Sequence, residues 1–390
     1  MAGTFSHTAL FVLTLPLLLL QTVGPENKGF YLALVNCSAA FISLFLLWLA
    51  GSYVDRRPDG SRHRWLVSCA LFFALVPLVV ITFVQGYGVI AIALIALFLA
   101  RVVTDAGLLA TLTDDETLRP RERFTASLIV MHFLGSVLGA VAFGIFPLFL
   151  PIGQSLLILP AAGVAFALTC MALLCFLQAT RKSNQTGKSN PPLSVRLALT
   201  SDFKYFLIAR SCFLAGILAV PLFLVFMVGD LMMAEDVRRT SAELMACLLI
   251  GGLLSSTVSG RLVHKIGEKS LLVRAGIILA LIAPIFLVAL SRSTLLAMAC
   301  MIAFGAGFGA IMVAGTSLSI KLAADTGMSG RYMALVTMST FLSQFLASAS
   351  GGMVLDPLNQ LGDNLGYWGL LVVVELFFFC GGWALQGVKS

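Results

Sequence analysis

Long, nearly unbroken apolar segments alternate with short polar connections along this 390-residue chain. Each segment is long enough to cross the ~30 Å hydrocarbon core of a bilayer as a helix. Continuous apolar runs predict helices rather than the alternating strands of a membrane barrel. Twelve segments are predicted, near 6–23, 31–50, 65–84, 89–112, 124–149, 155–178, 204–229, 240–262, 271–291, 294–317, 331–354 and 366–386.

The composition agrees with a chain embedded in lipid. Apolar residues make up 59% of the chain and charged residues only 11%, with a mean hydropathy of +1.01. An ordinary soluble domain carries roughly 25% charged residues, so a soluble enzyme, a disordered protein and a disulfide scaffold are excluded. The stretch 9–20 is as apolar as the core of a signal peptide, but no Lys or Arg precedes it. We therefore expect a retained first helix.

The distribution of charge predicts an orientation. The net charge is +7, and the basic residues recur at intervals between apolar runs, which favours a membrane protein over a nucleic-acid binder. With both termini in the cytoplasm, 19 basic residues lie on the inner face. Four lie on the outer face: Lys28, Arg238, Arg239 and Arg292. The positive-inside rule therefore predicts a multi-pass protein of the cytoplasmic (inner or plasma) membrane with both termini inside.

Two features divide the predicted helices into equivalent halves. A polar connection over 179–203 is rich in Ser, Asn, Gly and Pro, so it predicts a cytoplasmic linker between a bundle at 1–178 and a bundle at 204–390. Related patterns also recur at an offset of 208–209 positions. The pairs are Gly51-Ser-Tyr-Val-Asp55-Arg56 with Gly260-Arg-Leu-Val-His264-Lys265, and Arg123-Phe-Thr-Ala126 with Arg331-Tyr-Met-Ala334. Such repeats are common in secondary transporters.

The run from Gly51 to Arg57, with Arg62 and Arg64 downstream, resembles the signature loop between helices 2 and 3 of the major facilitator superfamily. The copy departs from the usual pattern, since Pro58 stands where a glycine is usual. The resemblance implies an all-α fold of twelve transmembrane helices in two pseudo-symmetric six-helix bundles. It also implies a transporter that works by alternating access. General features are slightly closer to the drug- and siderophore-exporting branches.

Arg101 and Asp105 form the leading candidate for substrate binding and coupling. Four positions apart on the predicted fourth helix, they share one face with Cβ atoms roughly 6 Å apart. A charge at this depth costs at least ~2.5 kcal/mol, so it is tolerated facing the bundle interior or a watery cavity. We expect Arg101 to bind an anionic group and Asp105 to exchange a proton. The alternative is a self-neutralising pair that locks the helix to a neighbour.

Further polar residues within the apolar segments are candidates for the same site. Glu375 and His132 are potential proton sites, or else neutral buried groups bonded within the bundle. Arg210 is a substrate contact or cytoplasmic gate, or else it reaches the inner surface. Gln344 and Asn36 line the cavity or bridge helices. The predicted conformational gate comprises Asp55, Arg56, Arg57, Arg62, Arg123, Gly260, Lys265 and Arg331.

These observations predict a secondary transporter for a small amphipathic or anionic organic solute, with protons as the expected driving ion and export favoured over import. A proton-coupled uptake symporter and a non-transporting receptor or assembly factor are the alternatives. We expect no cofactor and no metal site, because the eight cysteines all lie in apolar segments without a Cys-x-x-Cys pair. Four scattered histidines argue against an enzyme. The expected partners are the solute and membrane lipids, with a monomer as the functional unit.

Overall fold

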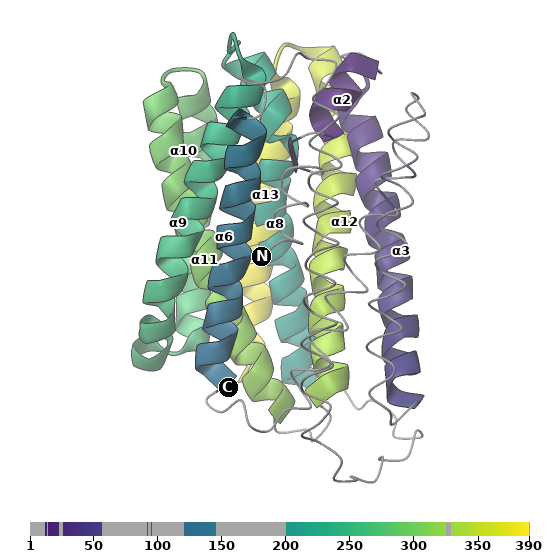
Figure 1. Ribbon diagram of the computed structural model, residues 1–390, viewed down its shortest axis with the longest axis vertical. Helices are drawn as coiled ribbons and strands as arrows, with labels where there is room; N and C mark the ends of the chain where they lie inside the picture. Colours follow the sequence, from purple (N-terminus) through teal and green to yellow (C-terminus); the bar gives the residue numbers. More distant parts are fainter. Residues whose placement is uncertain are drawn as a thin grey trace.

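The computed structural model describes residues 12–13, 15–22, 26–56, 92, 95, 121–145, 200–324 and 329–389, and the regular structure over these ranges is helical (Figure 1). The helices are α2 (Leu15–Thr22), α3 (Lys28–Arg56), α6 (Arg121–Ile145), α8 (Ser201–Leu231), α9 (Val237–Ile266), α10 (Glu268–Leu290), α11 (Thr294–Ala324), α12 (Ser329–Leu361) and α13 (Leu365–Gln386).

Every described helix coincides with one of the predicted apolar segments. Six of these helices are long and apolar enough to cross a membrane, which confirms a multi-pass helical membrane protein. The predicted segments 65–84 and 155–178, almost all of 89–112 and most of the linker lie outside the described residues. The count of twelve helices and the cytoplasmic position of the termini therefore stay predictions.

The helix α12 is 33 residues long and more polar than its neighbours, yet it packs against α3, α8 and α13. Its serines are satisfied within the helix: Ser343 Oγ donates to the Ser339 carbonyl at 2.6 Å, and Ser348 Oγ to the Gln344 carbonyl at 2.7 Å. These hydrogen bonds to the preceding turn pair the buried hydroxyls of Ser343 and Ser348 within the helix. A serine-rich helix can therefore lie inside the bundle.

The helix boundaries carry the internal repeat that the sequence predicts. The helix α3 begins at Lys28 and α9 at Val237, 209 positions later, while α6 begins at Arg121 and α12 at Ser329, 208 positions later. The structure packs α3 against α12 and α6 against α9. Because α3 corresponds to α9 and α6 to α12, the repeat exchanges these two contacts. The halves of the chain therefore meet through a pair of related interfaces.

Glycines bring α9 and α11 into backbone contact. A Cβ added to Gly305 would lie 1.8 Å from the Leu248 carbonyl oxygen, and one added to Gly251 would lie 2.0 Å from that of Ile302. Only a residue without a side chain allows this approach. One residue, Gly267, separates α9 from α10, and its φ of 80° lies in the left-handed region that glycine adopts readily. The helices α9, α10 and α11 thus form one tightly packed unit.

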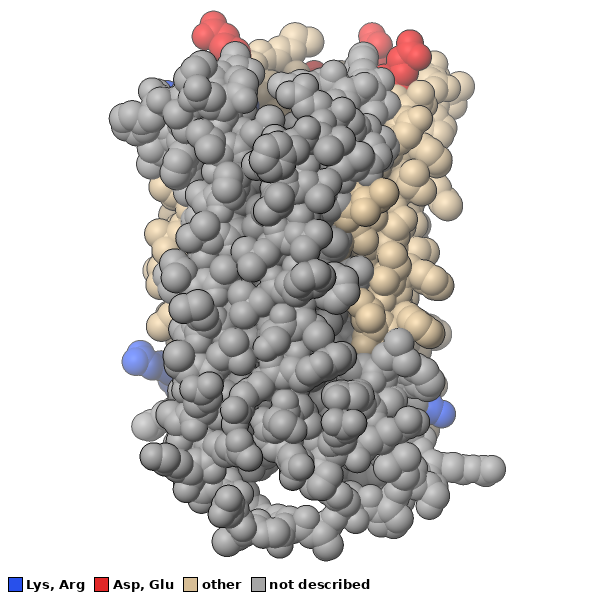
Figure 2. All heavy atoms as spheres, turned by 45° about the vertical axis from the view of Figure 1, so that its right-hand side comes forward, with Lys and Arg blue, Asp and Glu red and all other residues tan. Residues whose placement is uncertain are grey.

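The acidic side chains visible in Figure 2 gather at one end of the molecule, while Asp202 and Glu268 lie in the first turns of α8 and α10 and Glu375 lies within α13. This end contains the C-terminus of α8 and the N-termini of α3 and α9, whereas the chain ends at the opposite end (Figure 1). Its acids are Glu26, Asp230, Glu235, Asp236, Glu243, Asp356 and Asp363. This arrangement agrees with an acidic outer face, and we refer to this end as the outer end.

Candidate functional site

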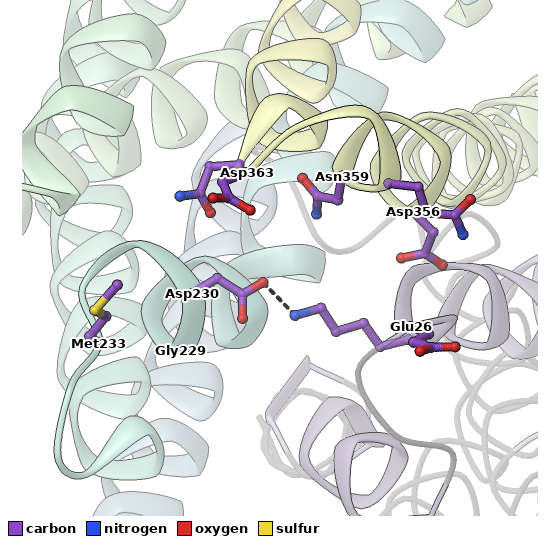
Figure 3. Close-up of a pocket in the computed structure, with 10 residues that line it drawn as sticks. Glu26, Gly229, Asp230, Met233, Asp356, Asn359 and Asp363 are labelled. Atoms are coloured by element: carbon purple, nitrogen blue, oxygen red, sulfur yellow. Dashed lines mark hydrogen bonds and ion pairs between the residues drawn. The ribbon is translucent and has the colours of Figure 1, made fainter.

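A polar pocket of about 760 Å³ opens at the outer end, where α3 of the first half meets the second half (Figure 3). Four acids, one lysine and three amides line it: Glu26, Asp230, Asp356, Asp363, Lys28, Asn359, Gln360 and Asn364. The side chains come from the start of α3, the end of α8, the last turns of α12 and the α12–α13 connection. The pocket therefore spans the boundary between the two halves.

Lys28 is the cation at the centre of this boundary. It is 4% exposed, and its Nζ forms an ion pair with Asp230 of α8 and lies 5.2 Å from the centroid of the Phe226 ring. Tyr367 of α13 donates a second hydrogen bond to the same carboxylate at 2.5 Å. A buried cation needs such partners, and truncating one partner of a buried pair typically costs about 3–5 kcal/mol. The ion pair holds the first half to α8, and Tyr367 fixes the carboxylate from α13.

Asp356 of α12 caps α3 across the same boundary. Its Oδ1 accepts the backbone N–H of Gly29 at 3.2 Å, and its Oδ2 accepts that of Phe30 at 2.7 Å. The first N–H groups of a helix have no partner within the helix, and the helix dipole favours an anion there. A residue 326 positions away in the chain thus supplies the cap of α3. The cap and the Lys28 ion pair act at the same helix terminus.

Two predicted site residues, Asn36 and Gln344, meet further along α3 and α12. Gln344 Nε2 donates to Asn36 Oδ1 at 3.4 Å. The fully buried Asn36 also donates its Nδ2–H to the Leu32 carbonyl one turn earlier in α3, at 3.0 Å. Cys37 Sγ contacts the Phe345 carbonyl oxygen at 3.6 Å. The amides therefore bridge helices in this structure, while their contact with substrate stays a prediction.

Replacing Asn36 by Leu is expected to lower stability by only about 0.6 kcal/mol, the average value of a hydrogen bond between membrane helices. The 3.4 Å distance indicates a weak bond, and Leu fills a similar volume. Thermal unfolding of the purified protein measures this effect, with Ser38→Leu as the control, because Ser38 is only partly buried on the same helix and its hydroxyl bonds the Leu34 carbonyl of that helix. A loss of folding in Asn36→Leu would show that the amide pair is a major structural contact.

The symmetry-related interface joins α6 to α9 through aromatic packing. A Cβ added to Gly252 of α9 would lie 2.5 Å from the Phe133 ring of α6, which also meets Phe308 edge to face at 5.2 Å. The predicted proton site His132 is half-buried beside Phe133, at 6.2 Å between ring centroids. Its neighbour Phe133 forms a contact between the halves, and the role of His132 as a proton site stays a prediction.

The two halves separate toward the other end of the molecule. In Figure 1, α3 and α12 lie close together near the outer end and diverge toward the end where the chain terminates. Contacts between these two helices include residues 28–37 of α3 and 344–356 of α12. The described interface is therefore closed at the outer end, and the axes of α3 and α12 diverge from there toward the inner end in this view.

Two predicted charged candidates lie within helices. Arg210 lies ten positions into α8 and is 7% exposed, so its guanidinium does not reach the inner surface as a snorkelling side chain would. Glu375 of α13 is half-buried, and its Oε1 has no hydrogen-bond partner in the described structure. Both residues thus lie within apolar helices, while their roles in substrate or proton binding stay predictions.

The remaining predicted residues are not placed at a site. The substrate pair Arg101 and Asp105 and the gate residues Arg57 and Arg62 lie outside the described residues. Asp55 and Arg56 lie in the last turn of α3, and Arg123 and Arg331 are each the third residue of their helices. Gly260 and Lys265 lie in the last turns of α9, with open space around Gly260 and an exposed Lys265. Their role as a gate stays a prediction.

Sequence reasoning missed the outer cluster of Lys28, Asp230, Asp356 and Tyr367. These residues stand at helix ends, where polar side chains are ordinary, so their positions alone carry no signal. One signal was available: Lys28 is the single basic residue that the orientation places on the outer face of the first half. An isolated cation facing an acidic surface is a candidate for an ion pair between the halves.

Together, the helices and the exchanged interfaces define a membrane transporter built from two related halves. The family model of the Major Facilitator Superfamily matches residues 1–348, and the chain belongs to this superfamily. The family predicted from the signature loop is thereby confirmed. No curated protein matches the chain.

Solved structures show the same fold at low sequence identity. The nucleoside transporter NupG is 14% identical, with a TM-score of 0.72 over 100% of this chain and 97% of that one. A bacterial homologue of the iron transporter ferroportin matches in its outward-facing state with 14% identity and a TM-score of 0.68, over 100% of this chain and 98% of that one. Its inward-facing state matches with 15% identity and a TM-score of 0.68, over 100% and 96%.

Proposed function

We propose that this protein is a secondary active transporter that moves a small amphipathic or anionic organic solute by alternating access. One observation carries the proposal: the two halves meet through interfaces that the repeat exchanges, and the described interface is closed at the outer end and diverges toward the inner end. Rocking one half against the other would open the outer end and close the inner end. With both termini in the cytoplasm, as the sequence predicts, this arrangement would be the inward-facing one of the proposed cycle.

Protons are the proposed driving ion, with Arg101 and Asp105 as the coupled site and export as the favoured direction. Support comes from the sequence, which places an acid and a base one turn apart at membrane depth. Glu375, His132 and Arg210 are the further charged or titratable candidates at that depth. A proton-coupled uptake symporter would use the same residues with the opposite direction of solute movement.

A proteoliposome screen tests this function. Purified protein is reconstituted with an imposed pH gradient, and the movement of labelled organic acids, amphipathic cations and neutral solutes is measured. We expect gradient-driven transport of at least one solute and its loss, by about tenfold or more, in Asp105→Asn. Glu235→Gln, which neutralises an exposed outer acid, serves as the control. Full gradient-driven transport in Asp105→Asn would refute the coupling site, and no movement of any solute would favour the non-transporting receptor.

A further inference from the structure

The guanidinium of Arg210 is a buried cation whose partner is missing from the described structure. Its Nε and Nη1 are inaccessible to solvent and form no hydrogen bond with any described residue. Arginine remains charged in proteins, and buried charges at membrane depth are almost always paired. An unpaired charge at this depth lowers the stability of the protein. Arg210 is therefore expected to have a ligand that binds it during function.

Gly315 of α11 makes room for this guanidinium. A Cβ added to Gly315 would lie 2.8 Å from Arg210 Nη1 and 4.0 Å from Leu272 of α10. The guanidinium therefore lies against the backbone of α11, next to α10, in a space that any side chain at 315 would reduce.

Among the described residues, the acids on the helices around Arg210 do not pair with it. Glu268, the single acid of α10, accepts a hydrogen bond from Ser317 at 3.4 Å and lies 3.9 Å from Lys321 Nζ. Asp202 lies in the first turn of α8, eight positions or roughly 12 Å away along the helix. The helix α11 contains no acid.

Glu375 of α13 is also out of reach. The contacts of Gly216 with Phe378 and of Gly381 with Phe213 show that α8 and α13 run antiparallel. This register places Glu375 level with residue 219 of α8, nine positions or roughly 13 Å from Arg210 along the axis. The two unpaired groups thus do not complete each other.

We propose that Arg210 is the binding residue for an anionic group, a carboxylate or a phosphate, with Gly315 allowing the guanidinium to lie against the backbone of α11. A guanidinium matches both anions through paired N–H donors. The anion belongs either to the transported solute or to a lipid headgroup. If the anion is part of the solute, the inference rests on the proposed function and specifies the transported substrate as an organic anion.

The first experiment compares stability without ligand. Arg210→Met retains the side-chain volume and removes the unpaired charge, so the unfolding midpoint of the ligand-free full chain in phosphatidylcholine nanodiscs should rise by at least about 2 °C. Arg274→Met, at an exposed position of α10, should leave the midpoint within about 1 °C. A fall of the midpoint in Arg210→Met would mean that Arg210 serves the structure, and it would overturn the proposal.

The second experiment measures anion binding with benzoate and inorganic phosphate as probes and benzamide as the neutral analogue of benzoate, all at one ionic strength. Wild-type protein should be stabilised by at least one anion in phosphatidylcholine nanodiscs if the ligand is a solute. If the ligand is a lipid headgroup, the wild-type protein should be stabilised only when phosphatidylglycerol replaces phosphatidylcholine in the nanodiscs. Either effect should disappear in Arg210→Met. No stabilisation by any anion, or equal stabilisation of Arg210→Met, would overturn the proposal.

Gly315→Ala provides the matched variant that keeps the charge. The new methyl group would displace the guanidinium tip, which belongs to a flexible side chain, so folding should be preserved while the anion affinity falls by about tenfold or more. Unchanged affinity in Gly315→Ala would contradict the placement of the site. Binding is measured here without transport, so failure of this inference and failure of the proposed transport function give separate results.

Discussion

Asp230→Lys is expected to open the outer end and to reduce any transport by about tenfold or more. The substitution sets a second cation against Lys28, which is 4% exposed and has Asp230 as its ion-pair partner. Breaking a buried pair costs about 3–5 kcal/mol, and the partial exposure of Asp230 reduces this figure. Even about 1.4 kcal/mol shifts the ratio of the two states tenfold. Spin labels at the exposed Asn27 and Leu361 would report the change as a population with a longer distance across the outer end.

The charge swap separates the ion pair from its individual residues. Lys28→Asp combined with Asp230→Lys restores opposite charges, so the short-distance population should return to within about threefold of its wild-type level. Asp363→Lys is the control, because Asp363 lines the same pocket without a described contact to Lys28. Opening in Asp363→Lys equal to that in Asp230→Lys would indicate a general effect of pocket charge instead of the specific pair.

Gly251→Leu is expected to prevent folding. Even an added Cβ would lie 2.0 Å from the Ile302 carbonyl oxygen, and that atom belongs to the backbone of α11 and cannot rotate away. The helices α9 and α11 would have to separate, which breaks the packing that associates membrane helices. We expect the loss of a monodisperse species in size-exclusion chromatography and a destabilisation of more than about 3 kcal/mol.

Gly260→Leu and Gly382→Leu are the matched controls for this substitution. Both glycines lie in helices, in α9 and α13, and nothing lies within 4 Å of a Cβ added at either position. They should remain monodisperse, with midpoints equal to or slightly above the wild-type value, because glycine is the poorer helix former. If the controls aggregated as well, the defect of Gly251→Leu would not come from the contact between α9 and α11. It would mean that these helices do not accept a larger side chain at any of these glycines.

The helices could be predicted well because their signal is local. A run of about 20 apolar residues in lipid has to satisfy its backbone within itself, and the helix is the solution available to a single segment. The ends were less predictable: α12 continues to Leu361 and α3 begins at Lys28, beyond the apolar runs near 331–354 and 31–50. Polar residues extend these helices because neighbouring helices supply their partners, as Asp356 does for the first turn of α3.

The sequence by itself determined the membrane-embedded helical class, the two related halves and the superfamily, because apolar runs, spaced repeats and a signature loop are all read from residues near one another. Only the tertiary structure decided which polar residues meet. Lys28 and Asp230 are 202 positions apart, and Asn36 and Gln344 are 308 apart. Their pairing depends on how the two halves dock, and docking is set by close helix contacts such as Gly352 against Ala33. Packing of α8 beside α11 buries Arg210, whose Nε and Nη1 form no hydrogen bond among the described residues.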